Sequence, residues 1–105
     1  MGKGINLERL AVKMAIECFE GCAAGRYAGS KGPRRGSYAN ASPIDISIFL
    51  KDRVYDCQVK TDRKYLSKKE RLELIEYCEI YDHIPLIFDG TFWFCGKTPN
   101  EDEPI

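Results

Sequence analysis

Residues 42–60 read SPIDISIFLKDRVYDCQVK and predict two short strands joined by a tight polar turn at Lys51 and Asp52. Apolar and polar side chains alternate along both halves, as they do in strands whose two faces differ. One face of the first strand is expected to carry Ile44, Ile46, Ile48 and Leu50, and the other Asp45, Ser47 and Phe49. Val54, Asp56, Gln58 and Lys60 are expected to share a face of the second strand. An acid, an amide oxygen and a lysine therefore converge on one side of the expected hairpin.

Composition indicates a single globular domain. The chain has 105 residues, of which 44% are apolar and 30% charged, enough for one hydrophobic core. We expect a folded domain over residues 1–97 and an acidic, frayed C-terminal tail over residues 98–105. No apolar run approaches the roughly 20 residues of a membrane span, and the first residues lack the apolar core of a signal peptide. A cytoplasmic protein without a membrane partner is expected, and the small size is also compatible with a viral origin.

Charge is distributed unevenly along the chain although the net charge is zero. Residues 1–71 contain 15 basic and 8 acidic side chains, whereas residues 72–105 contain 1 basic and 8 acidic ones. The glycine-rich segment 29–37, GSKGPRRGS, has three basic residues and no acid. Such a segment is expected to be a loop, and its charge favours contact with phosphate. Surface charge exposed only to solvent is the alternative interpretation.

The remaining elements follow from periodicity and capping signals. A first helix is expected over residues 5–20 and a short strand over residues 26–30. The apolar stripe expected to face inward on this helix consists of Leu7, Leu10, Ala11, Met14 and Cys18, widened by Ile16 and Phe19. Ser67 and Glu70 have the spacing of a capping box, which predicts the start of a second helix that runs to about Asp82. Two further strands, residues 84–88 and 91–95, surround a type I′ turn signal at Asp89-Gly90. The order α-β-β-β-α-β-β predicts an α/β fold with a small mixed β-sheet flanked by helices.

Cofactor chemistry based on cysteine is not indicated. The five cysteines include no C-x-x-C pair, and His83 is the only histidine, so a zinc site has few ligands. We expect reduced and mostly buried thiols. His83 itself is expected to be a simple cap at the end of the second helix.

Several residues, taken in order, resemble a known nuclease pattern. They are Glu8 on the first helix, Ser30 on the basic loop, Asp45 on one strand and Gln58-x-Lys60 on the next. This order resembles the PD-(D/E)xK nuclease superfamily, and in particular the archaeal-type Holliday-junction resolvases (Hjc family). Gly4-x-x-x-Glu8-Arg9 is similar to the opening signature of that family, and Arg26-Tyr27-Ala28-Gly29-Ser30 to its Arg-x-x-Gly-Ser segment. The resemblance spans residue 4 to about residue 94.

Two departures from the family pattern affect the expected site. Gln58 stands where the E-x-K motif has glutamate, and the segment between Ser30 and Asp45 is longer than is usual. An amide oxygen can bind Mg²⁺ but adds no negative charge, so metal affinity is expected to fall. Asp56, two residues earlier on the same expected face, could compensate in part.

The resemblance implies a restriction-endonuclease-like αβββαβ core and a Mg²⁺-dependent endonuclease, with Mn²⁺ as substitute and no small-molecule cofactor. It implies a homodimer that acts on four-way or branched DNA. The implied metal ligands are Glu8, Asp45 and Gln58, while Lys60 would orient the attacking water and Ser30 the scissile phosphate. The implied DNA contacts come from Arg9, Arg26, Lys31, Arg34, Arg35 and Lys64.

Other interpretations remain open. Gln58 favours a DNA-junction binding module that does not cleave, and the superfamily also includes nucleases with other DNA substrates. Asp45 could simply face solvent, and Glu8 could serve only the dipole of its helix. Residues 92–94, Phe-Trp-Phe, are expected in the core or a dimer interface rather than in a base-stacking platform.

The basic segment yields a first testable prediction. Replacing Lys31, Arg34 and Arg35 together by alanine should weaken DNA binding and flatten the slope of log affinity against log salt. Each lost phosphate contact should change that slope by about one unit. Titration of a labelled junction at several salt concentrations measures the slope, and an unchanged slope would show that the segment only meets solvent.

Overall fold

The chain forms one six-stranded sheet flanked by two helices. The computed structural model describes residues 2–26 and 43–105, and the side chains of residues 6–25 and 43–105. The elements, in chain order, are α1 (Gly2–Cys18), β1 (Ala23–Arg26), β2 (Ile46–Phe49), β3 (Val54–Val59), η3 (Arg63–Tyr65), α2 (Lys68–Tyr81), β4 (Ile84–Phe88), β5 (Phe92–Phe94), η4 (Pro99–Glu101) and β6 (Glu103–Pro104). The strands lie side by side in sequence order, with β3 and β4 parallel and all other neighbours antiparallel. The predicted α/β class with a mixed sheet is confirmed.

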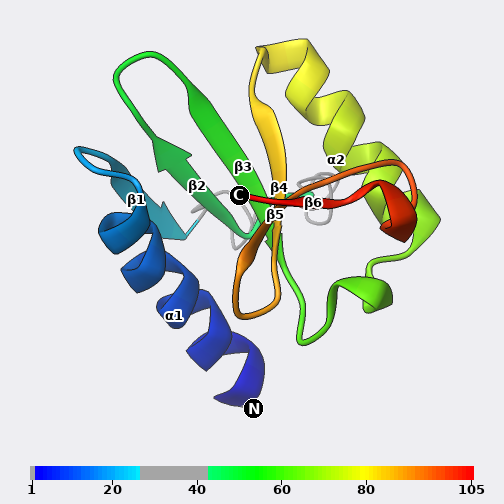
Figure 1. Ribbon diagram of the computed structural model, residues 1–105, viewed down its shortest axis with the longest axis horizontal. Coiled ribbons are helices and arrows are strands. Elements are labelled where there is room, and N and C mark those ends of the chain that lie inside the picture. Colours follow the sequence, from blue (N-terminus) through cyan, green and yellow to red (C-terminus); the bar gives the residue numbers. More distant parts are fainter. Residues whose placement is uncertain (1, 27–42) are drawn as a thin grey trace, which may run out of the picture.

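The helices lie on opposite faces of the sheet. α1 packs on β1, β2 and β3, whereas α2, which connects the parallel pair, packs on β3 and β4 (Figure 1). Successive residues of β3 point to opposite faces of the sheet. Cys57 faces the apolar core under α1, whereas the charged Asp56 faces α2. β3 is therefore covered on both sides, at the centre of the molecule.

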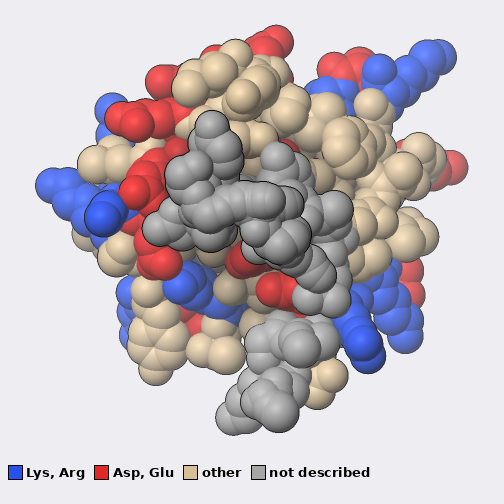
Figure 2. Space-filling model, turned by 180° about the vertical axis from the view of Figure 1, so that it is seen from behind, with Lys and Arg blue, Asp and Glu red and all other residues tan. Residues whose placement is uncertain are grey.

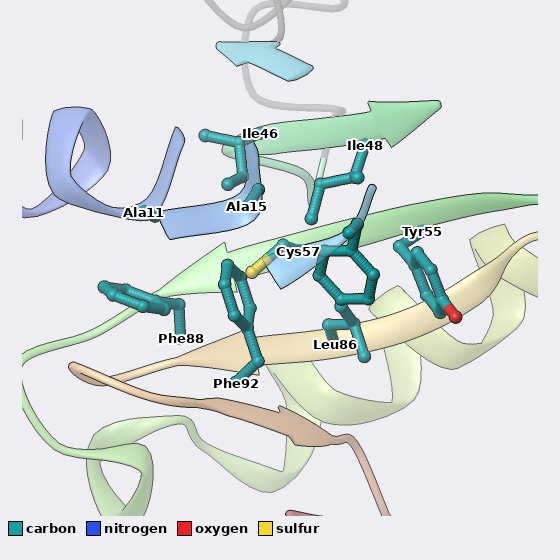
Figure 3. Packing of buried hydrophobic residues seen from close by; sticks show 10 residues of the cluster. Ala11, Ala15, Ile46, Ile48, Tyr55, Cys57, Leu86, Phe88 and Phe92 are labelled. Atoms are coloured by element: carbon teal, nitrogen blue, oxygen red, sulfur yellow. The ribbon is translucent and has the colours of Figure 1, made fainter. Parts of the chain in front are cut away.

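The larger hydrophobic core fills the space between α1 and the sheet. Its buried side chains come from α1, β2, β3, β4 and β5, with Phe92 in contact with Phe88 and Phe19 (Figure 3). Ala11 and Ala15 have no exposed surface, and their small side chains let the helix lie close to the strands. Phe92 is thus a core residue, as the sequence predicted.

The buried stripe of α1 differs in part from the predicted one. Ala11, Ala15 and Phe19 are buried, and Leu7 and Met14 are partly buried against them. Leu10, Ile16 and Cys18, which were expected to face inward, are exposed. α1 also begins at Gly2 instead of residue 5. β1 at residues 23–26 begins before the expected strand over residues 26–30, of which residues 27–30 lie outside the described part of the chain, as do all residues up to 42.

The polar face predicted for the β2–β3 hairpin is buried at its centre, at Ser47 and Asp56. Ser47 and Asp56 are cross-strand partners under α2, and the Ser47 hydroxyl donates a 3.1 Å hydrogen bond to the Asp56 carboxylate. Ile44 was expected beside Ile46, but it packs with α2 residues while Ile46 packs in the α1 core. The chain changes direction at residue 45, before β2 begins. Alternation alone could not reveal this, because a hydrogen-bonded polar pair can be buried as a unit.

α2 begins and ends as its capping signals predict. The Ser67 hydroxyl accepts from the Glu70 N–H, the Glu70 carboxylate accepts from the Ser67 N–H, and Asp82 ends the helix in a left-handed conformation. The helical spacing predicts an inward face of Leu72, Ile75, Cys78 and Tyr81. Cys78 is buried as predicted, but the rest of the face is rotated, because the other buried residues are Arg71 and Leu74. Tyr81 is exposed.

The burial of Arg71 explains that rotation and corrects the expectation of a frayed tail. Asp102, whose side chain has 0% exposure, receives two hydrogen bonds from the Arg71 guanidinium, one from Arg63 and one from the Gly96 N–H. η4 and β6 place Asp102 there, with β6 paired to β5. Residues 98–105 therefore form part of the folded structure.

The turn predicted at Asp89-Gly90 is decided by backbone geometry. Gly90 has a φ of +115°, but no other residue of the 88–92 connection has a positive φ, so the turn is not the predicted type I′. Thr91 closes the turn instead, through hydrogen bonds with Asp89.

No helix in the described part of the chain is long and apolar enough to cross a membrane.

The expectation of mostly buried thiols is met by two of the five cysteines. All five are free thiols, with Cys57 and Cys78 buried and Cys18 exposed. Burial raises the pKa of Cys57 well above its usual range and that of Cys95 to about 11. These two thiols therefore stay protonated at neutral pH and are poor nucleophiles.

The Asp102 cluster generates a stability prediction. Asp102→Ala should lower the free energy of unfolding by about 3–5 kcal/mol, because it leaves the buried Arg71 guanidinium without its charged partner. Urea denaturation at pH 7 measures this change, with the exposed Glu103→Ala as the matched control. A loss as small as that of the control would show that Asp102 does not stabilise the fold.

The same variant tests a pH dependence. Burial would raise the pKa of Asp102, but hydrogen bonds from Arg71, Gly96 and Arg63 outweigh it and hold the pKa below the usual 3.8. A lowered pKa in the folded state means that the stabilisation is present at neutral pH and is lost as the pH falls through the folded value. The difference between wild type and Asp102→Ala should therefore shrink below pH 3.8.

Candidate active site

Asp45 lies where β2 begins and β3 ends. The two strands are antiparallel, so the residue before Ile46 meets the residues after Cys57. The Asp45 N–H donates to the Cys57 carbonyl, and Asp45 Oδ2 accepts a 2.9 Å hydrogen bond from the Val59 N–H. The backbone of β3 thus fixes the orientation of the Asp45 carboxylate.

Lys60 follows β3 at the same end of the sheet. Its N–H donates a 3.0 Å hydrogen bond to the Phe88 carbonyl, which ties residue 60 to the end of the parallel strand β4. Lys60 Nζ lies 3.1 Å from Glu70 Oε2 at the start of α2, with both side chains partly exposed. The sequence predicted Glu70 only as a capping residue. Its contact with Lys60 could not be seen from sequence, because it depends on how α2 packs.

Glu8 contributes charge to this end of the sheet from α1. Its negative charge acts on Asp45 together with that of Glu70, while Lys60 acts in the opposite sense. Because α1 begins at Gly2, Glu8 is not in the first turn, where a carboxylate would stabilise the helix dipole. The interpretation of Glu8 as a mere dipole partner is therefore wrong.

The pKa of Asp45 is raised above its usual range. Burial is the main cause, the Val59 hydrogen bond lowers the pKa in part, and the charge of Glu8 adds to the rise. A half-buried carboxylate with acidic neighbours is a common feature of functional sites.

The side-chain amide of Gln58 is hydrogen-bonded to the backbone. Its Nε2 donates a 2.6 Å hydrogen bond to the Pro43 carbonyl, two residues before Asp45. A carbonyl only accepts, so this contact needs the amide nitrogen and leaves the amide oxygen as the remaining acceptor of the side chain. Gln58 thus holds the segment that leads into Asp45.

Asp56 cannot compensate for Gln58 as the sequence suggested. It is 1% exposed under α2, where its carboxylate lies 2.6 Å from His83 Nδ1 and accepts from Ser47. This position is on the α2 side of the sheet, among structural partners. His83 is therefore more than a helix cap, because it joins the end of α2 to β3.

The fit to a divalent cation is limited. In residues 2–26 and 43–105, no three His, Cys, Asp or Glu side chains are grouped so as to hold a metal. Mg²⁺ retains several waters and often binds through one or two carboxylates together with substrate phosphate. Asp45, with Glu8 as an acidic neighbour and an amide oxygen at Gln58, supplies donors of that chemistry.

Most of the predicted DNA contacts fall outside the described side chains. Ser30, Lys31, Arg34 and Arg35 belong to residues 27–42, and the side chain of Arg26 is not described either. Arg9 on α1 and Lys64 in η3 are both exposed. Figure 2 shows acidic and basic side chains along the border of the undescribed segment, so this face does not carry charge of one sign.

The aromatic residues of β5 do not form an open stacking platform. Phe92 is buried. The Arg63 guanidinium lies over the Trp93 ring, 4.0 Å from the ring centroid, and Trp93 Nε1 donates a hydrogen bond to Asp89. Phe94 is 37% exposed. Only part of this segment therefore remains accessible to a partner.

The chain thus has an αβββαβ core, with Asp45 and Lys60 at one end of its β2–β3 hairpin. Among solved structures, the chain is similar to Archaeoglobus fulgidus Hjc, a Holliday junction resolvase from an archaeal hyperthermophile. The TM-score is 0.62 at 20% sequence identity, and the alignment covers 97% of this chain and 87% of that chain. Neither a protein-family model nor a curated protein matches the chain. The likeness confirms the fold that the sequence resemblance implied.

The Gln58 contact yields a prediction. Gln58→Glu should lower the free energy of unfolding at pH 7 by about 1–3 kcal/mol, because a carboxylate would place an acceptor against the Pro43 carbonyl. A protonated glutamate can donate to that carbonyl, which raises the pKa of the glutamate in the folded state. The loss relative to wild type should therefore decrease as the pH falls from 7 toward about 4. Thermal unfolding of both proteins at pH 7 and pH 4 measures it. Equal stability at pH 7 would contradict a structural role for the amide.

Proposed function

We propose that this protein is a metal-dependent, structure-selective endonuclease that resolves four-way DNA junctions. The observation that supports this most directly is the placement of Asp45 and Lys60 at one end of the β2–β3 hairpin. It occurs within a fold that resembles a Holliday junction resolvase.

The proposed metal would be held by Asp45, with Glu8 and the amide oxygen of Gln58 as further donors. A bound Mg²⁺ or Mn²⁺ stabilises the negative charge that accumulates in phosphodiester hydrolysis and lowers the pKa of water. Within the protein, the Val59 N–H orients Asp45 and the β4 carbonyl of Phe88 fixes the backbone of Lys60. The Lys60 ammonium would then orient the attacking water and stabilise the negative charge that develops on the phosphate.

We further propose that the active form is a homodimer. Resolution of a four-way junction requires two nicks related by symmetry, and a two-fold dimer supplies two equivalent sites. The basic side chains of residues 26–35, with Arg9 and Lys64, are the proposed contacts to the DNA backbone. The protein would act inside the cell, or within a virus-infected cell.

A second candidate function is junction binding without cleavage. It is favoured by Gln58, which replaces a charged ligand and donates to Pro43, and by the lack of a three-acid group in the described residues. Incubation with a labelled four-way junction and Mg²⁺, Mn²⁺ or EDTA separates the two functions. A linear duplex serves as the substrate control and also tests for a superfamily nuclease with another DNA preference. Binding without nicking under every metal would favour the second candidate.

Asp45→Asn should abolish junction cleavage and leave junction affinity nearly unchanged, because it removes a metal ligand and no phosphate contact. Single-turnover cleavage and electrophoretic binding assays measure the two properties. Asp52→Asn, in the exposed hairpin turn, is the matched control and should cleave like wild type. Metal-dependent nicking by Asp45→Asn at the wild-type rate would contradict the assignment.

A further inference from the structure

The Lys60 ammonium has a defined partner. A lysine side chain at the end of a strand is long and flexible, and usually extends into solvent. Here Nζ lies 3.1 Å from Glu70 Oε2, and the two side chains are 27% and 35% exposed. Partial burial reduces the screening of this pair relative to a fully exposed one. The contact therefore restricts where the ammonium lies.

Glu70 is itself held in place by the start of α2. Its Oε1 accepts a 2.9 Å hydrogen bond from the Ser67 N–H, and its own N–H donates to the Ser67 hydroxyl. One carboxylate oxygen is thus used by the helix cap and the other by Lys60. The residue connects a rigid helix terminus to the end of β3.

The backbone brings this connection to Asp45. Val59, which donates to the Asp45 carboxylate, directly precedes Lys60 in the chain. The charges of Lys60 and Glu70 both act on Asp45. An ammonium held by Glu70 is therefore held near the carboxylate on which the proposed reaction depends.

We propose that Glu70 is a positioning residue for Lys60, holding its ammonium beside Asp45 for phosphodiester cleavage. This inference rests on the proposed nuclease function and adds a residue from α2 to the site. A role as metal ligand is less consistent with the geometry, because both carboxylate oxygens already accept hydrogen bonds. A role in capping alone would not require the Lys60 contact.

Glu70→Gln separates these roles. Glutamine at this position of a capping box still accepts from the N-cap N–H, so the helix start is preserved while the charge is removed. We expect the melting temperature, junction affinity and Mn²⁺ affinity to remain near wild type. The cleavage rate at saturating DNA should fall by about 10- to 100-fold, as expected when a reacting group is misplaced. Glu70→Asp, which keeps the charge, should recover part of that rate.

Glu73→Gln is the matched control, because it removes the same charge from an exposed position on the same helix. It should leave cleavage unchanged. A readout independent of cleavage is the acetylation of Lys60 by a water-soluble reagent, followed by mass spectrometry. Loss of its ion-pair partner in Glu70→Gln should make Lys60 more reactive, whereas Glu73→Gln should not.

The outcomes distinguish failure of the inference from failure of the proposed function. A wild type that cuts no DNA overturns the nuclease proposal and this inference with it. An active wild type with unchanged cleavage in Glu70→Gln overturns the inference alone, as does unchanged reactivity of Lys60. A loss of Mn²⁺ binding in Glu70→Gln also overturns it, because Glu70 would then act as a metal ligand.

Discussion

The pairing of β3 with β2 on one edge and with β4 on the other is the constraint on which the structure depends. Antiparallel pairing brings Asp45, before β2, to the Val59 N–H at the end of β3. Parallel pairing with β4 brings the Phe88 carbonyl to the N–H of Lys60. A shift of one residue in either register would turn every side chain of the shifted strand to the other face of the sheet. The site therefore depends on the register of the central strand.

The parallel pair also determines where α2 lies, and α2 in turn determines part of the site. Parallel neighbours require a crossover, and here it contains η3 and α2. Arg71 in the first turn of α2 is held by the buried Asp102. Glu70 is the adjacent residue, so the ion pair that fixes Arg71 also fixes the turn from which Glu70 contacts Lys60. Through this turn the C-terminal segment supports the candidate active site.

The two faces of the sheet differ in the polarity of the groups buried on them. The α1 side is mainly apolar, with Ile46, Cys57 and Phe88 in one cluster. The α2 side contains the Asp56 carboxylate with His83 and Ser47 as partners. A buried carboxylate is costly unless it is hydrogen-bonded, which explains why three elements meet around Asp56. Asp45 differs from Asp56 because it is only half-buried at the end of the sheet.

The sequence by itself determined the order of helices and strands from α1 to β5, the capping of α2 and the α/β class, because these depend on local periodicity and on hydrogen bonds between near neighbours. It also indicated Asp45 and Lys60 as candidates, through their spacing on a hairpin. Only the tertiary structure decided that Asp56 is buried, that Gln58 donates to Pro43 and that Glu70 contacts Lys60. It likewise showed that Asp102 holds Arg71 inside the fold. These contacts join residues 10 to 31 positions apart, and their partners depend on how helices and strands pack, which no local pattern records.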